Sequence, residues 1–428
     1  MRSLPGSWQR ERGFCGCAEA KDSWSLSSVP AGQRIHYLDW LKVLIVYGIF
    51  VYHVALVFVV ANWLVSNHER IPILSIFVAL TFPWGIPAMF LISGADAWFG
   101  LRRRSARHFI WQRVLRLLLP MAAGLAVLSP FQRFVTSQNP PPSLDQLPAY
   151  YMSFFRDFHF IWSMQWVSKY WLHLWFLGYL FVISIACLPL VQRLRSGSGP
   201  RITGFVLRIA IWRGGLLLLA LPLAVLQVIL RPHFPGYQDW ADVATYTYVF
   251  LWGALLVTDR RFEAAIRRDI HLILLAAIIA ALGSGYIFLT AHLKLNLTAS
   301  LDTPATLSFA ILWTFEVWCW LLAVLYPGIR WLDFPNRVIS YLEESILPFY
   351  VLHHPVLLAV ASYVVTWRLG AWPKFFAILV IGGTITMTLY EYGVRRWNLM
   401  RTIFGLRPLP SPQISETLIP VPVEVPSI

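Results

Sequence analysis

Long apolar runs recur along almost the whole chain, and no other feature limits its possible folds so strongly. A helix needs about 20 consecutive apolar residues to cross the hydrocarbon core of a bilayer, and several runs reach that length. Charged residues make up only 13% of the 428 positions, about half the share that a soluble domain carries. We therefore expect an all-α, polytopic transmembrane helical bundle rather than a soluble or disordered protein.

We expect about ten membrane-spanning helices between the polar ends of the chain, at about 20 residues each. The sixth is the shortest. The expected spans cover residues 41–63, 73–99, 114–135, 171–191, 211–230, 243–258, 270–290, 305–326, 346–367 and 374–394.

The distribution of positive charge predicts the orientation. Most of the 35 Lys and Arg residues fall in the two termini and in the loops that ten spans would place on the same side. Loops rich in Lys and Arg stay in the cytoplasm, so both termini are expected there. The net charge of +14 then follows from membrane topology and does not indicate a nucleic-acid partner.

The chain divides into three regions. Residues 1–33 lack the apolar core of a signal peptide, so we expect a disordered cytoplasmic leader. We expect residues 34–397 to form the membrane domain and residues 398–428 to form a Pro-rich cytoplasmic tail, in which six prolines between Pro408 and Ile428 block a regular helix. Cys15 and Cys17 in the leader have no further ligands nearby, and we expect no metal site there.

His53 is the most informative polar residue within a span. It follows Lys42 by 11 residues, which is three helical turns and about 16 Å along one face. Asp39 can pair with Lys42 from one turn earlier. A buried, neutral imidazole has one ring nitrogen that accepts a proton, which suits a general base. The alternative is a histidine that only forms a hydrogen bond between helices.

Two short motifs next to the second and third spans each allow two interpretations. Ser93-Gly94 offers a small surface for close helix packing or for a ligand that passes against the backbone. Arg113 and Arg116 are i, i+3 neighbours, and two guanidinium groups on one face suit phosphate oxygens. The same pair could instead anchor the third span or contact anionic lipid.

Further polar side chains lie in the later spans. His173 and Trp175 open the fourth span, and His353 lies in the ninth. Pro355 is expected to break the ninth helix locally and to free backbone carbonyls. The sequence assigns no role to three further ionisable residues, Glu316, His354 and Glu391.

Taken in order, these segments resemble the acyltransferase 3 family of bacterial integral-membrane acyltransferases, and are similar to its branch of glucan succinyltransferases. The resemblance covers roughly residues 34–397 and depends on five short motifs. They are Tyr37-Leu-Asp-Trp-Leu-Lys42 with His53, Phe90-Leu-Ile-Ser93-Gly94, Arg113-Val-Leu-Arg116, His173-Leu-Trp-Phe-Leu177 and Leu347-Pro-Phe-Tyr-Val-Leu-His353.

The resemblance implies an acyl-CoA co-substrate, most often acetyl-CoA, that is reached from the cytoplasm, with no permanently bound cofactor or metal ion. It implies an acceptor hydroxyl on a sugar or another envelope or secreted molecule. It also implies a multi-pass protein of the inner (plasma) membrane, in contact with the lipid bilayer.

The resemblance also implies roles for individual residues. The family's Arg and His of the first helix correspond to Lys42 and His53, and lysine keeps the charge of arginine but loses its planar fork. The R-x-x-R pair of the family corresponds to Arg113 and Arg116. The expected site residues are therefore His53, Lys42 and Asp39 for catalysis, Arg113, Arg116, Ser93 and Gly94 for the donor, and His173, Trp175 and His353 for the acceptor.

We expect His53 to take the proton from the acceptor hydroxyl as that oxygen attacks the thioester. A covalent acyl-histidine is a variant that the sequence leaves open. The alternative function is a proton-coupled secondary transporter, since ten helices with buried His and Glu also fit one. Against it, the two halves of the chain show no convincing inverted repeat.

Overall fold

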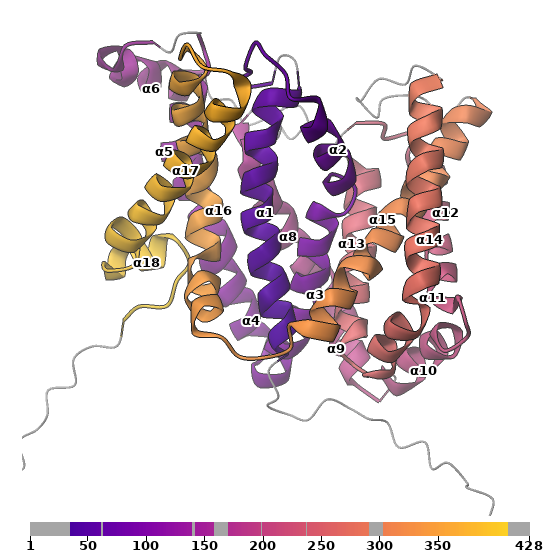
Figure 1. Ribbon diagram of the computed structural model, residues 1–428. Coiled ribbons are helices and arrows are strands. Elements are labelled where there is room, and N and C mark those ends of the chain that lie inside the picture. Colours follow the sequence, from indigo (N-terminus) through magenta and orange to yellow (C-terminus); the bar gives the residue numbers. More distant parts are fainter. Residues whose placement is uncertain are drawn as a thin grey trace, which may run out of the picture.

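The computed structural model describes residues 35–60, 63–138, 142–157, 170–197, 199–236, 238–290 and 303–409 (Figure 1). Every regular element in these ranges is a helix, which confirms the all-α prediction for the described part of the chain. The expected leader, with Cys15 and Cys17, and residues 410–428 of the expected tail lie outside the described residues.

The helices follow one another closely along the chain. Those of the first half are α1 (His36–Val59), α2 (Pro72–Thr81), α3 (Gly85–Arg103), α4 (Ala106–Arg113), the π-helix η1 (Val114–Leu118), α5 (Leu119–Val135), η2 (Leu144–Gln146), α6 (Leu147–Arg156), η3 (Leu172–Leu174), α8 (Trp175–Ala186), α9 (Leu188–Arg195) and α10 (Gly199–Ala210). Those of the second half are α11 (Gly215–Leu218), α12 (Leu221–Leu230), α13 (Trp240–Leu256), α14 (Arg261–Thr290), α15 (Pro304–Trp331), α16 (Arg337–Val364), α17 (Ala371–Thr388), the π-helix η4 (Leu389–Val394) and α18 (Asn398–Ile403).

Seven helical segments in the described ranges are long and apolar enough to cross a membrane, or up to nine if two bent pairs each count as one span. The bent pairs are Leu172–Ala186 with Leu188–Arg195, at 49°, and Gly199–Ala210 with Gly215–Leu230, at 117°. The remaining expected span is α13, whose 17 residues extend only about 26 Å, less than a hydrocarbon core of about 30 Å. Length and composition thus support a multi-pass membrane protein, with seven to nine such segments in the described ranges. The expected number of ten spans stays a prediction.

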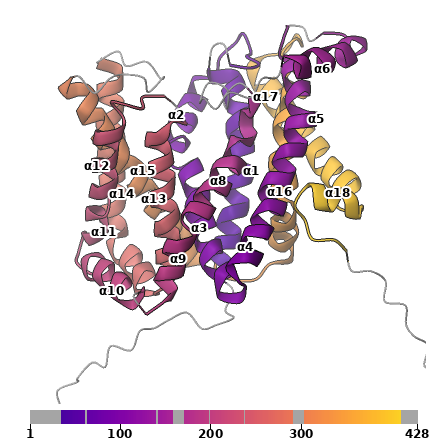
Figure 2. The ribbon, with the colours of Figure 1, turned by 180° about the vertical axis from the view of Figure 1, so that it is seen from behind.

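Helix α1 lies in the middle of the bundle (Figure 1). It contacts α16 and α17 on one side and α2, α3 and α15 on the other. Helices α12, α14 and α15 form one edge of the bundle, and α5, α17 and α18 form the opposite edge (Figure 2). Helices α4, α9 and α10 lie at one end of the bundle and α6 lies at the other.

Helices α3 and α13 meet backbone to backbone at two glycines. A Cβ on Gly94 would lie 1.8 Å from Phe250 O, and a Cβ on Gly253 would lie 1.8 Å from Leu91 O. Such contacts between small residues are typical of helices that pack in a membrane. The structure therefore supports the packing interpretation of Ser93-Gly94. At Gly94, α13 fills the space that a ligand would need. A donor-binding role for Ser93 stays a prediction.

The first residues of the expected tail belong to the bundle. Helix α18 packs against α5 and η4, and the buried Arg401 donates to Glu344 Oε1 at 2.8 Å. Gly405 has a φ of +71°, and a Cβ on it would lie 3.1 Å from Arg116 Cα. The chain after η4 therefore covers the backbone at Arg116, and the boundary expected at residue 397 falls inside packed structure.

Candidate active site

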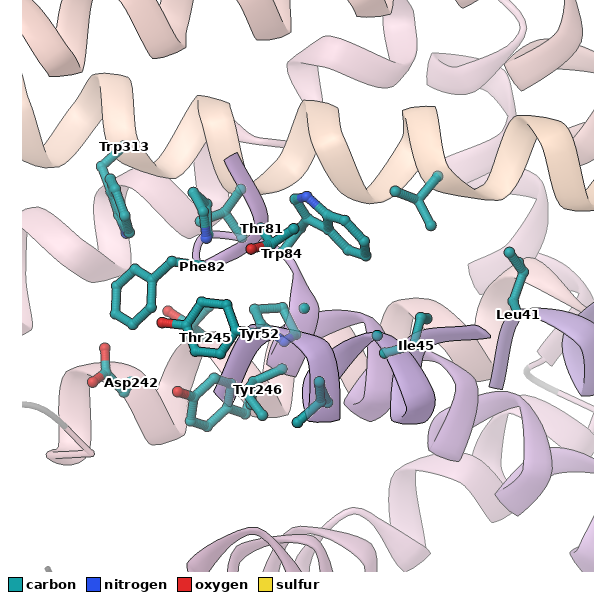
Figure 3. Close-up of a pocket in the computed structure, with 18 of the residues that line it drawn as sticks. Leu41, Ile45, Tyr52, Thr81, Phe82, Trp84, Asp242, Thr245, Tyr246 and Trp313 are labelled. Atoms are coloured by element: carbon teal, nitrogen blue, oxygen red, sulfur yellow. The ribbon is translucent and has the colours of Figure 1, made fainter. Parts of the chain in front are cut away.

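A cavity of about 500 Å³ runs along α1, and three of the expected site residues line it: His53, His173 and Trp175 (Figure 3). Leu41 and Ile45 lie toward one end of it, and Asp242 and Trp313 lie at the other. The α1 side is apolar except for Tyr52 and His53. The other walls come from the break between α2 and α3, from η3 and α8, and from α12, α13, α15 and α16.

Four histidines from three elements meet beside this cavity. His53 comes from α1, His173 from η3, and His353 and His354 from α16. The His53 ring centroid lies 5.4 Å from that of His353 and 5.0 Å from that of His354. His173 stacks on His354 at 4.6 Å, with 17° between the planes, and lies 5.5 Å from His353. We call these four residues the histidine cluster; His53 and His173 line the cavity directly.

Hydrogen bonds fix the proton positions in two of these rings. His53 Nδ1 lies 2.9 Å from Ile49 O, and His354 Nδ1 lies 2.5 Å from Gln132 Oε1. A carbonyl or amide oxygen only accepts, so Nδ1 carries the hydrogen in each ring. In the neutral imidazole, Nε2 then holds the lone pair. His53 is thus a cavity-lining residue whose Nε2 can accept a proton.

The orientation of His173 depends on a proline in α16. Pro355 has no N–H, and the helix carbonyl that it leaves without its usual partner is Val351 O. His173 Nε2 donates to this carbonyl at 3.1 Å. The carbonyl that the sequence predicts to be freed is therefore Val351 O, and it accepts a hydrogen bond from His173. The predicted break is wrong, because α16 continues from Arg337 to Val364 through Pro355. Burial among neighbouring helices allows the helix to lose one bond without breaking.

Two ring nitrogens of the cluster face inward without a hydrogen bond. His353 Nδ1 donates to Tyr350 O at 2.7 Å, and its Nε2 is buried. Within the described part of the chain, this Nε2 and His173 Nδ1 have no hydrogen-bond partner. Both are lone-pair positions in these tautomers, and a buried acceptor without a donor is costly. The cluster thus holds two buried lone pairs that no donor among the described residues satisfies.

The backbone beside His173 has an unusual conformation. Leu172 has a φ of +46°, in the left-handed region that residues with a side chain rarely adopt. Such conformations persist where the surrounding structure holds them, often at functional sites. Here the turn places His173 between α16 and the cavity, while Trp175, the next expected acceptor residue, lines the cavity two positions later.

A group of charged residues lies toward the Leu41 end. Lys42 Nζ lies 2.9 Å from Asp96 Oδ2 and 3.9 Å from Glu343 Oε1, and the carboxylate of Asp39 adds to the negative field at Lys42. These ion pairs tie α1 to α3 and α16. Lysine thus serves here as a point charge between carboxylates, which does not require a planar fork.

Arg113 and Arg116 belong to the same group of charges. The Arg113 guanidinium lies over the Phe109 ring at 4.9 Å, and both arginines are close enough to Asp96 to interact with its charge. Arg116 lies within the π-helix η1, where the i, i+3 alignment of an α-helix no longer holds. Such π turns occur frequently at functional sites.

The structure thus separates the expected residues into two groups. His53, His173 and His353 meet at the cavity, whereas Lys42, Arg113 and Arg116 lie toward one end of it. Sequence reasoning missed His354 and Gln132. Neighbours on a helix point about 100° apart, so nothing local showed that His353 and His354 would both be buried and face the same histidines. Gln132 comes from another helix, and no spacing relates it to His354.

The other ionisable residues without an assigned role have structural partners. Glu316 Oε2 accepts from Ser284 Oγ at 2.7 Å between α15 and α14, and Glu391 pairs with Arg395 at 3.2 Å. In the ranges that the structure describes, no three His, Cys, Asp or Glu side chains are arranged to hold a metal ion.

Comparisons with known proteins identify the family of the chain. Residues 35–391 match the acyltransferase 3 family, described as an acyltransferase domain. The chain is also similar to proteins named "Glucans biosynthesis protein C" from Escherichia coli K12 and O157:H7, with 22% identity over 398 and 397 residues. Each alignment covers 90% of this chain and 97% of the relative. No solved structure matches. The chain belongs to the acyltransferase 3 family and is a multi-pass membrane acyltransferase.

Proposed function

We propose that the protein transfers an acyl group, most simply acetyl, from cytoplasmic acyl-CoA to a hydroxyl of a glucan. The observation that carries this proposal is a single cavity that is apolar next to the charged group of Lys42 and passes the histidine cluster further along. The name of the Escherichia coli relatives supports a glucan as acceptor. The excess of Lys and Arg on one side supports cytoplasmic termini and an inner-membrane location.

In this proposal the donor enters from the charged end. Arg113 and Arg116 hold phosphate oxygens of CoA, since guanidinium groups form paired hydrogen bonds with phosphate. The pantetheine arm lies along the apolar half of the cavity, beside Ile45 and Gly48. No atom lies within 4 Å of a Cβ built on Gly48, which leaves room for the arm. The thioester then lies beside His53.

The chemical step needs only a base and an activated acyl group. His53 Nε2 takes the hydroxyl proton while the acceptor oxygen forms a bond to the thioester carbonyl carbon. The C–S bond breaks, and the leaving thiolate of CoA receives the proton from His53. In the covalent variant Nε2 itself attacks the thioester carbonyl carbon, and the C–S bond breaks to release the thiolate. The acceptor oxygen then attacks the acyl carbon, the C–N bond breaks, and the hydroxyl proton goes to the thiolate. The Nδ1–H bond to Ile49 O supports Nε2 as the reactive atom in both routes.

The first experiment is transfer of radiolabel from acetyl-CoA to a glucan fraction, with free CoA measured in parallel. Membranes with the wild-type protein are compared with His53→Ala and with His271→Ala, a matched control on the exposed face of α14. We expect label and free CoA from the wild type and the control, and neither from His53→Ala.

Other outcomes separate the alternatives. Equal transfer by His53→Ala and the wild type would contradict His53 as the base. Uptake of the glucan without release of a free thiol would favour the transporter. No label from any sample, with acetyl-CoA and glucan both supplied, would contradict the donor or the acceptor.

A further inference from the structure

The end of the cavity away from Lys42 is lined by polar side chains that the transfer step does not use. We call them the α12–α13 polar cluster: Gln227, Arg231, Asp242 and Thr245. Gln227, Arg231 and Asp242 are each less than a tenth exposed. Burial of an ion pair costs desolvation energy, so its presence in a cavity wall calls for a reason.

Hydrogen bonds hold this cluster in one arrangement. Arg231 Nη2 lies 2.5 Å from Asp242 Oδ1 and 2.8 Å from Gln227 Oε1. Gln227 Nε2 donates to Thr245 Oγ1 at 2.6 Å and to Ala241 O at 2.7 Å. The side chains are therefore fixed before a ligand arrives, which lowers the entropic cost of binding.

Aromatic rings face this cluster across the cavity (Figure 3). Phe82 and Trp84 come from the break between α2 and α3, and Trp313 comes from α15. Phe82 and Trp313 pack at 5.8 Å between ring centroids, and Trp84 is held by its Nε1–H bond to Leu80 O at 2.7 Å. One wall is thus planar and apolar, and the opposite wall is polar.

This combination fits a neutral ligand with many hydroxyl groups. The charges of Arg231 and Asp242 offset each other, so the cluster favours neither an anion such as a CoA phosphate nor a cation. Amide and hydroxyl groups can both donate to and accept from adjacent hydroxyls, and a carboxylate accepts from them. The C–H face of a sugar ring can lie on an aromatic ring, as apolar surface packs on apolar surface. A few fixed polar groups in a mostly apolar pocket set orientation and specificity.

The cluster is also connected to the reacting end of the cavity. Tyr246 follows Thr245 on α13 and lies 5.8 Å from Trp175 between ring centroids. Trp175 is two residues beyond His173 of the histidine cluster. A sugar held at the α12–α13 polar cluster can therefore extend a hydroxyl toward His53 from the side opposite the apolar half.

We propose that the α12–α13 polar cluster, with the facing rings of Trp84 and Trp313, is the subsite that binds the acceptor sugar. This rests on the proposed function for the identity of the acceptor, but sugar binding itself can be measured without a donor. The competing explanation is that the ion pair only fastens the end of α12 to the start of α13.

The experiment measures binding of a soluble gluco-oligosaccharide to the purified full-length protein by calorimetry, without acyl-CoA. The variants are Thr245→Val, which keeps the shape and removes the hydroxyl, and Trp313→Leu. Thr290→Val is the matched control, since Thr290 is exposed at the end of α14. We expect Thr245→Val and Trp313→Leu to bind the oligosaccharide about tenfold more weakly, as loss of one good contact implies.

The outcomes distinguish the subsite from the proposed function. Unchanged binding in Thr245→Val and Trp313→Leu, or no binding by the wild type, overturns the subsite. Weaker binding in both variants supports it, even if no acyl transfer from acetyl-CoA is found. With transfer established, the KM for the oligosaccharide should rise in these variants while the KM for acetyl-CoA stays near that of the wild type. A rise in both constants would indicate a general structural defect and count against the subsite.

Discussion

The two ends of the cavity are built from different kinds of helical structure. The apolar half lies along the unbroken helices α1 and α15, of 24 and 28 residues. The polar half is built where helices end, at the break between α2 and α3, after α12 and at the start of α13. In the middle of an unbroken helix the backbone N–H and C=O groups bond to one another, so only the side chains are available to a ligand. A helix end leaves backbone groups that need polar partners.

This difference indicates where a membrane protein can recognise an apolar ligand and where it can recognise a polar one. Unbroken helices make an apolar slot, which suits a flexible chain such as pantetheine. Helix ends bring polar side chains and fixed hydrogen bonds to membrane depth, which suits a hydroxylated ligand. The histidine cluster lies between the two, and one of its orienting bonds depends on a carbonyl that Pro355 leaves free.

The largest expected effect is at His53, where the two halves meet. In His53→Asn the side-chain amide can take the place of Nδ1–H and still donate to Ile49 O, but the lone pair of Nε2 is lost. We expect kcat to fall by about 10²- to 10⁴-fold, the usual contribution of a general base. Single-turnover assays with labelled acetyl-CoA measure this. A kcat within a few fold of the wild type would exclude proton transfer at Nε2.

The next effect tests the apolar half alone. Gly48→Leu places a side chain where a Cβ meets no atom within 4 Å, so it should obstruct the arm of the donor without disturbing the fold. Two or three lost methylene contacts at about 0.8 kcal/mol each predict a rise of about ten- to hundredfold in the KM for acyl-CoA.

Gly285→Leu is the matched control for this change. Gly285 lies in α14, outside the cavity, and also has open space at its Cβ position. Replacing a helical glycine should raise helix stability in both variants. An unchanged KM for acyl-CoA in Gly48→Leu would show that the donor does not bind in this half of the cavity.

A third change tests how the helix carbonyl orients the cluster. Pro355→Ala restores an N–H that can bind Val351 O, so His173 must compete for its acceptor. We expect a stability equal to or above that of the wild type, since proline is unfavourable inside a helix. We expect kcat to be about tenfold lower, the loss of one orienting bond.

Pro348→Ala provides the comparison for Pro355→Ala. It removes another proline within α16 without changing the partner of Val351 O. Melting temperature and kcat are measured for both variants. Equal kcat values would show that the bond from His173 to Val351 O has no part in catalysis.

The smallest effect is at the charged end. Arg116→Lys keeps the positive charge but loses the planar fork, so one hydrogen bond to a phosphate should weaken. We expect the KM for acyl-CoA to rise about threefold, with Arg208→Lys on the exposed face of α10 as the control. If the KM for acyl-CoA rose more in Arg208→Lys than in Arg116→Lys, the donor phosphates would bind elsewhere.

The sequence predicted most of the fold class and part of the site. Each of the ten apolar runs corresponds to one helix or to successive helices, and α13, at 17 residues, extends less than the thickness of a hydrocarbon core. His53, His173 and His353 were singled out because ionisable groups are costly in lipid, and all three lie in one cluster. The sequence left two interpretations of Ser93-Gly94, helix packing and donor binding, because a small-residue pair looks alike whether it faces a ligand or a helix.

By itself, the sequence determined that this chain forms helices in a membrane. Apolar length and the cost of an unsatisfied backbone act locally, residue by residue, so they can be read without knowing the fold. Only the tertiary structure decided which polar groups meet. His354 and Gln132 joined the cluster, Arg231 joined Asp242 at the far wall, and α13 filled the space at Gly94. These pairings depend on how separate helices rotate and pack against one another. The residue pattern within a single helix does not contain this information.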